Sequence, residues 1–196
     1  LMAWLIMLHR QPDLRFSRLA DKLASREYVR ERLGPEFLTE VYWEGTDPRK
    51  IPFDDLPDRY VIKPTHASGL VIVAGPELDR EAAVEEIADW LRHNYYWQGR
   101  EYQYLDIAPR IMVEELVDDG TEGGPLDYSP WCFNGTPKLV QVRKYPRLVN
   151  QFYDLDWRPL PLKVRQNIPE IDLDPPPRFE EMKEAAARLA DDVPFV

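Results

Sequence analysis

A lysine at the end of a short apolar run is the first residue whose type and position could do chemistry. Lys63 closes a β-branched run typical of a strand, and the chain continues through His66, Ser68 and Gly69 into a second apolar run. The proline after Lys63 removes an amide donor and Gly69 allows backbone angles that other residues avoid, so a loop is predicted there. An ammonium at the mouth of this loop, with loop amides and the serine hydroxyl nearby, could neutralise a polyphosphate. A strand-end lysine is also often solvated or half of an ion pair, and these alternatives stay open.

A second lysine lies in the N-terminal part of the chain. Apolar residues with helical spacing run from Asp13 to Leu33, and Gly34 with its following proline is the stop signal. Lys22 falls within this predicted helix, directly after Asp21. Taken alone, the two residues would be interpreted as an exposed charged pair.

Strands and helices must position these lysines. Strands are predicted where apolar and β-branched residues run together, at 38–43, 60–63, 70–73 and 111–117. A helix is predicted from Asp79, because its apolar residues recur on one face and its acids on the other. The run at 111–117 includes two acids, Glu114 and Glu115, and leads into a linker of Asp, Gly and Thr.

The C-terminal part opens with a hairpin signal. Two predicted strands, 126–133 and 138–143, are joined through Asn134-Gly135, a dipeptide typical of a tight hairpin turn. Asp127 lies at the start of the first strand, and Arg143 ends the second.

Loops dominate the sequence that follows the hairpin. After Tyr145 the chain is loop-rich, and the prolines of residues 159–177 predict an ordered surface excursion with disorder as the alternative. A helix is predicted at 179–190. Residues 193–196 have the composition of a strand that is cut off.

Composition limits the class of protein. The 196 residues are 44% hydrophobic, enough to bury the core of one domain or two small lobes. A formal net charge of −10 argues against a nucleic-acid partner. The single cysteine, Cys132, permits no disulfide within the chain and fits a buried residue of a cytoplasmic protein. The three histidines lie far apart in the sequence and give no zinc signature.

The opening residues, 1–8, are apolar but too few to span a bilayer. They lack a basic leader and a small-residue cleavage site, so they predict a core helix and no transmembrane segment. A chain that starts on Leu1 is expected to be a fragment.

Several segments in a fixed order carry a resemblance to a known family. They are Asp21 to Val29, Leu56-Pro57, Tyr60 to Gly69, Pro109 to Glu115, Asp127-Tyr128, Cys132 to Gly135 and Tyr153 to Trp157. Together they resemble the ATP-grasp enzymes, and within them the TupA-like group associated with teichuronopeptide and capsule polysaccharide biosynthesis. The resemblance implies an α+β fold of two small lobes with mostly antiparallel sheets, divided into residues 1–116 and 117–196.

The resemblance also implies where a nucleotide would bind. In ATP-grasp proteins two lysines hold the ATP phosphates, in the positions of Lys22 and Lys63. The loop that contains His66, Ser68 and Gly69 resembles the flap that closes over those phosphates.

The base and the sugar have their own implied partners. Glu114, Glu115 and Leu116 resemble the hinge whose main chain pairs with the adenine edge. Asp127 resembles the acidic residue that accepts from the ribose hydroxyls.

The implied reaction is phosphoryl transfer from ATP to a carboxylate, which gives an acylphosphate that an amine attacks. Magnesium would bridge the phosphates, and a glycan or an amino acid would be the substrate. Arg143 could hold the transferring phosphate, and a surface salt bridge is the alternative for it.

The sequence departs from the family pattern in two places. The arginine, aspartate and glutamate that supply the metal ligands in the family would follow Val196, so the metal-binding strands are expected to be missing from this chain. Ser129 stands where the family usually has a lysine. The chain alone is therefore expected to be a poor catalyst even if it holds ATP. Two alternatives remain, a non-catalytic nucleotide- or glycan-binding module and an interaction protein without a nucleotide site.

Overall fold

A computed structural model describes residues 13–118, 120, 124–144, 149–163 and 173–196. The chain divides into two compact units, unit 1 up to Leu116 and unit 2 from Val117, and each is described by itself. The helix predicted over residues 1–8 lies outside the described residues.

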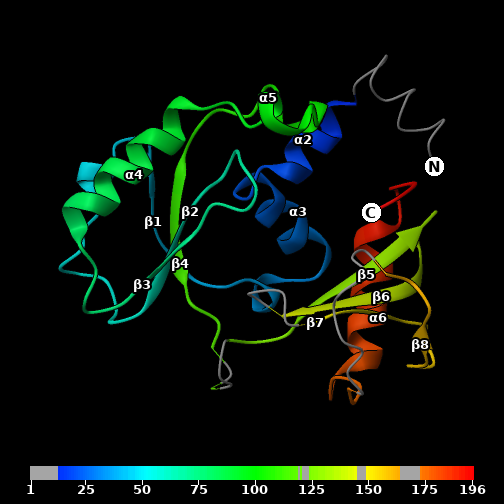
Figure 1. Cartoon of the computed structure of the whole chain (residues 1–196). Coiled ribbons are helices and arrows are strands. Elements are labelled where there is room, and N and C mark those ends of the chain that lie inside the picture. Colours follow the sequence, from blue (N-terminus) through cyan, green and yellow to red (C-terminus); the bar gives the residue numbers. More distant parts are fainter. Residues whose placement is uncertain (1–12, 119, 121–123, 145–148, 164–172) are drawn as a thin grey trace. The chain divides into compact units, whose positions relative to one another are not determined.

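Unit 1 is built on an antiparallel sheet of four strands in the order β1-β4-β2-β3 (Figure 1). The strands are β1 (Val41–Gly45), β2 (Tyr60–Pro64), β3 (Ile72–Ala74) and β4 (Ile111–Glu115). The predicted strands at 60–63 and 111–117 are therefore confirmed within a few residues. The strand expected at 38–43 is shifted toward the C-terminus, because the chain forms a 3-10 turn at Pro35–Phe37 and ladder pairing begins at Val41.

The core of unit 1 lies between this sheet and helix α4 (Arg80–Arg92), which runs along one side of it (Figure 1). Asp79 caps the helix, since its carboxylate accepts from the amides of Glu81 and Ala82. Alternate residues of β2 are buried, and Ile62 is fully buried in the same cluster as Ile87 of α4. Because side chains alternate along a strand, Lys63 lies on the opposite face, away from this core.

Short helical elements complete unit 1. They are α2 (Leu14–Ala20), α3 (Ala24–Arg32), η1 (Pro35–Phe37), η2 (Pro48–Lys50), α5 (Tyr96–Gly99) and η3 (Tyr102–Tyr104). The single helix expected between residues 13 and 33 is thus two helices, α2 and α3.

The break between α2 and α3 has a local cause. The Asp21 carboxylate accepts from the amide of Leu23 at 2.9 Å and, at 3.4 Å, from the first residue of α3, so it starts a new helix as a capping residue does. The amide of Lys22 donates instead to Thr65 O at 3.2 Å, on the loop after β2. The interruption therefore lets the main chain of Lys22 bind the loop after β2 instead of continuing a helix.

Unit 2 is a second antiparallel sheet, in the order β5-β6-β7-β8, with one helix packed on it. Its elements are β5 (Asp127–Phe133), β6 (Thr136–Lys144), β7 (Val149–Tyr153), β8 (Pro159–Leu160) and α6 (Phe179–Ala190). Val140, Val142 and Tyr153 form its buried centre, against which Phe179 and Met182 of α6 pack. The predicted hairpin and C-terminal helix are confirmed.

The sequence interpretation missed part of this sheet. Residues 149–153 were expected to be loop, but they pair with β6 as strand β7, and Tyr153 is 1% exposed. β7 is short and lies before the proline-rich residues 159–177, so its local strand signal is weak, whereas pairing to an existing strand supplies its hydrogen bonds. The end of the chain does pair with β5. Phe195 forms a bridge with Phe133, and Val196 exchanges main-chain hydrogen bonds with Cys132.

Two antiparallel sheets, each with helices on it, confirm the predicted α+β fold class. Cys132 is buried and free, as expected. Within the described residues no helix is both long enough and apolar enough to cross a bilayer.

Candidate functional site

The two predicted phosphate-binding lysines of unit 1 come from different elements and meet at one loop. Lys63 is the residue before the last of β2, and the loop to β3 begins directly after that strand. The Lys22 ammonium donates to Ala67 O in this loop, and the Lys22 amide donates to Thr65 O. Main-chain and side-chain bonds from the same residue therefore fix Lys22 against the segment that follows Lys63.

The positive charge of Lys63 affects the pKa of Lys22. Desolvation, followed by the positive charge of Lys63, lowers the pKa of Lys22 to about 8, although Asp21 and Glu114 act in the opposite direction. Two ammonium groups held close enough to repel each other are unfavourable in the free protein. A polyphosphate placed against them would relieve that repulsion.

A buried carboxylate forms an ion pair with Lys63. The Glu114 side chain is 8% exposed, and its carboxylate pairs with the Lys63 ammonium. The same carboxylate lies 3.3 Å from Arg26 and accepts from the Thr39 hydroxyl at 2.9 Å. The ion-pair alternative for Lys63 is therefore realised. It leaves two of the three ammonium protons for other acceptors, and the Lys63 side chain is 26% exposed.

The loop after Lys63 is tied at its start and open at its tip. The Thr65 amide donates to Arg110 O at 2.9 Å, while Ser68 and Gly69 are exposed. Gly69 has φ +79°, in the left-handed region, and nothing lies within 4 Å of the position of a Cβ. Both tip residues are thus within reach of a ligand, and the Ser68 side chain is hydrogen-bonded to Tyr104.

His66 is placed differently from the other predicted loop residues. It is 2% exposed, and its Nε2 lies 3.1 Å from Trp90 O near the end of α4. A carbonyl can only accept, so Nε2 carries the proton. This places His66 as a support of the loop rather than at its open tip.

An apolar surface adjoins Lys63 on the same face of the sheet. Val73 of β3 is paired with Val61, the residue two before Lys63, so their side chains share this face. Val73 is 57% exposed and Val71 is 53% exposed. An exposed apolar strip beside a cation suits a ligand that has a flat apolar part and a charged tail.

The predicted hinge residues are engaged to different degrees. Glu114 and Glu115 belong to β4, a central strand paired with both β1 and β2. The Glu115 amide already donates to Glu40 O at 2.9 Å. Leu116 follows the last residue of β4, so its main chain is the part of this segment outside the strand pairing.

In unit 2, the two predicted residues face each other across the β5–β6 hairpin. Asp127 and Arg143 are register partners, and Arg143 donates to the Ser129 hydroxyl at 2.8 Å. Asp127 is exposed. The Arg143 Nε is buried, and among the described residues it has no hydrogen-bond partner. A surface salt bridge for Arg143 is not observed within this part of the chain.

Arg26 and Thr39 were not among the predicted site residues, yet both hold Glu114. Arg26 lies four residues after Lys22, a spacing that brings side chains to one face of a helical segment, and this was the available signal. Thr39 carries no such signal, because its proximity to Glu114 arises from the pairing of two chain segments 75 residues apart.

The comparison with known families shows to which family the chain belongs. A model of the TupA-like ATPgrasp family matches residues 2–196. The chain belongs to this family. No curated protein and no solved structure matches it. The chain is therefore an ATP-grasp-type protein, and it has the lysine pair and the two antiparallel sheets described above.

The described residues of this ATP-grasp-type protein differ in how well they fit the two groups the family implies. Two ammonium groups beside an exposed loop tip fit a nucleotide polyphosphate. Among the residues the structure describes, no three His, Cys, Asp or Glu side chains are grouped so that they could hold a metal ion. The described residues therefore lack a cluster of carboxylates that would hold Mg²⁺ without the nucleotide.

Proposed function

We propose that this ATP-grasp-type protein binds ATP at the Lys22 and Lys63 ammonium groups and acts as an ATP-dependent carboxylate–amine ligase in cell-surface polysaccharide biosynthesis. The observation that carries the proposal is the meeting of these two lysines, from separate elements, at the loop after β2. Membership of this family supports the proposed reaction type.

The two lysines have complementary tasks. Lys63 is oriented by Glu114 and offers its remaining protons to the phosphates. Lys22 is anchored to the loop and offers a second positive charge, which the anion stabilises. The exposed tip at Ser68 and Gly69 adds a hydroxyl and main-chain amides that can close over the phosphates.

The rest of the nucleotide has candidate contacts in unit 1, and the family resemblance implies two more residues. In unit 1, the apolar strip at Val71 and Val73 suits the flat face of adenine, and the main chain at Leu116 suits its polar edge. In unit 2, Asp127 is proposed to accept from the ribose hydroxyls. Arg143, with its unpartnered Nε, is proposed to donate to the transferring phosphoryl group.

The proposed reaction has two steps. A substrate carboxylate oxygen attacks the γ-phosphorus of ATP, the bond to the β-phosphate oxygen breaks, and ADP leaves. An amine then attacks the carbonyl carbon of the acylphosphate, inorganic phosphate leaves, and the amine loses a proton. The cationic side chains stabilise the charge that develops on the phosphoryl oxygens.

The experiment is thermal unfolding with and without magnesium-ATP. At a ligand concentration about one hundred times the dissociation constant, binding adds roughly 2.7 kcal/mol to the free energy of unfolding. We expect this gain in the parent protein and its loss in Lys63→Ala and in Lys22→Ala. Each variant is compared with itself without nucleotide, so any intrinsic destabilisation cancels.

Lys50→Ala is the matched control, because Lys50 is an exposed lysine of η2 outside the site. It should retain the gain. An unchanged melt of the parent protein would refute ATP binding. ATP binding without turnover, tested with candidate acceptors, would instead indicate the non-catalytic nucleotide- or glycan-binding module.

A further inference from the structure

A cavity of unit 1 begins beside Lys22, at Leu23, and of the residues assigned above to the nucleotide only Glu115 lines it. Its volume is about 750 Å³, within the range of small-molecule sites. It lies between helix α3 with the turn after it and strand β1. Leu23, Leu38 and Val41 give it an apolar lining, and arginines and glutamates form its rim.

One side of the rim is acidic. Glu40 and Glu115 both line the cavity and are exposed. The Glu115 carboxylate accepts from the Glu40 amide at 3.1 Å, and within the described residues neither carboxylate has a cationic partner. The nearby Tyr42 hydroxyl reflects this charge, since its pKa is raised by desolvation and then by Glu115 and Glu40.

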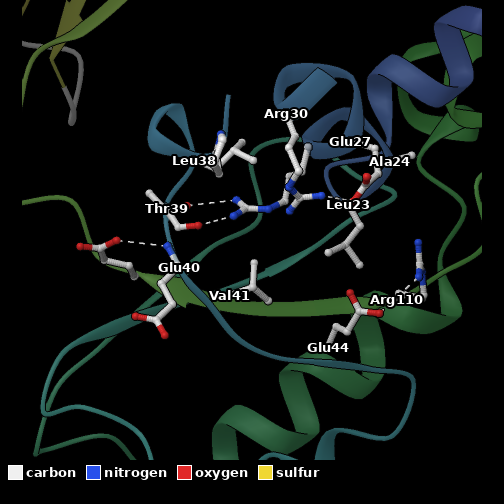
Figure 2. Close-up of a pocket in the computed structure, with 13 residues that line it drawn as sticks. Leu23, Ala24, Glu27, Arg30, Leu38, Thr39, Glu40, Val41, Glu44 and Arg110 are labelled. Atoms are coloured by element: carbon white, nitrogen blue, oxygen red, sulfur yellow. Dashed lines mark hydrogen bonds and ion pairs between the residues drawn. The ribbon is translucent and has the colours of Figure 1, made fainter. Parts of the chain in front are cut away.

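The other side presents a loosely held guanidinium. Arg110 lies 3.5 Å from Asp21 and 3.7 Å from Glu44, distances longer than a charge-assisted hydrogen bond, and its side chain is 36% exposed. Figure 2 shows Arg110 and Glu40 at opposite sides of the cavity, with Val41 between them. Of the other charged lining residues, Arg30 pairs with Glu27 and Arg26 with Glu114, and Glu44 is the carboxylate 3.7 Å from Arg110.

We propose that this cavity binds an amino acid or a short peptide as a zwitterion, with its carboxylate at Arg110 and its ammonium at Glu40 and Glu115. A planar guanidinium binds a carboxylate through paired hydrogen bonds, and free carboxylates over an apolar surface bind an alkylammonium. Both ends of such a ligand are satisfied, and its body covers Val41 and Leu23.

The position of the carboxylate end links the cavity to the lysines. Arg110 contacts Asp21, the residue before Lys22, and Arg110 O accepts from Thr65 in the loop after Lys63. Arg26 lines the cavity and also holds the carboxylate that orients Lys63. The ligand carboxylate thus lies at the end nearer the proposed phosphates. Its identification as the carboxylate substrate rests on the proposed function; its binding does not.

The experiment measures binding of three probes to the full chain by calorimetry, without nucleotide. Alanyl-alanine carries both charged ends, N-acetyl-alanyl-alanine lacks the ammonium, and alanyl-alanine amide lacks the carboxylate. We expect alanyl-alanine to bind and each blocked probe to bind about tenfold more weakly or worse. No binding of alanyl-alanine, or equal affinity for the three probes, would overturn the proposal.

Variants assign the two ends. Glu40→Gln should weaken the binding of alanyl-alanine about tenfold and leave the binding of the N-acetyl probe unchanged. Arg110→Gln should also weaken the binding of alanyl-alanine about tenfold, but leave the binding of the amide probe unchanged. Glu36→Gln and Arg49→Gln, exposed residues outside the cavity lining, should change nothing. If Glu40→Gln and Arg110→Gln both leave alanyl-alanine binding intact, the cavity is not its site.

The outcomes separate this inference from the nucleotide proposal. Peptide binding without an ATP-dependent rise in stability would retain the cavity and reject ATP binding. An ATP-dependent rise without peptide binding would reject the cavity alone.

Discussion

The two units assemble their candidate residues in different ways. In unit 2, Asp127, Ser129 and Arg143 lie on two strands of one hairpin, and the register of that hairpin alone brings them together. In unit 1, Lys22 reaches a loop 45 residues away, and Arg26 reaches Glu114 across 88 residues. A local turn organises the first group, whereas the second depends on the packing of several elements.

The difference has an energetic consequence. Arg143 sits at a hairpin position with one hydrogen bond to a neutral hydroxyl. Glu114 sits at the centre of two cations and a hydroxyl, almost out of contact with solvent. Removing the Glu114 carboxylate of unit 1 therefore leaves buried cations without their partner, whereas removing the Ser129 hydroxyl of unit 2 breaks a single hydrogen bond.

Substitution of Glu114 should have the largest effect. Glu114→Ala leaves the Lys63 and Arg26 cations without their shared carboxylate, and loss of one member of a buried charge pair costs about 3 kcal/mol or more. Urea unfolding measures it. Glu115→Ala, next in the sequence but exposed, should cost about 0.5 kcal/mol. Equal losses for the two variants would contradict the network.

The next largest effect is expected from substitution of one glycine in each unit. Gly135 and Gly69 both have φ in the left-handed region, but a Cβ on Gly135 would lie 3.3 Å from Asp191 whereas a Cβ on Gly69 would meet nothing. We expect Gly135→Ala to cost about 2 kcal/mol and Gly69→Ala about 1 kcal/mol of unfolding free energy. Thermal unfolding measures both, and the reverse order would show that the unit 2 turn is not under this constraint.

Nucleotide affinity should depend on pH through unit 1. The pKa of Lys22 is lowered to about 8, so its ammonium loses its proton as the pH rises through 8. An anion favours the charged form and raises this pKa on binding, so affinity for magnesium-ATP should fall about tenfold between pH 7 and pH 9. Calorimetry at several pH values measures this. Lys22→Gln should remove the dependence, and a parent protein with flat affinity would contradict the assignment to Lys22.

The smallest effect is expected in the unit 2 hairpin. Ser129→Ala removes the acceptor of the Arg143 hydrogen bond, which should cost about 1 kcal/mol of unfolding free energy. Ser129→Thr retains a hydroxyl and is the control. A loss comparable with that of Glu114→Ala would end the distinction between the two units.

The sequence alone determined the elements that local chemistry specifies. The Asn134-Gly135 turn, the helix capped by Asp79 and the strand that contains Lys63 were all predictable, because turn conformation, capping and side-chain alternation depend on near neighbours. Strand β7 was not, because its hydrogen bonds come from β6 rather than from its own residue types.

Only the tertiary structure decided which charges meet. The sequence gives no sign that Glu114 would take Lys63, Arg26 and Thr39 as partners, or that Arg110 and Glu40 would line one cavity. Electrostatic interactions and cavities depend on distance in space and on exclusion of water. The path of the chain brings these groups together across tens of residues, and their order along it does not encode that proximity.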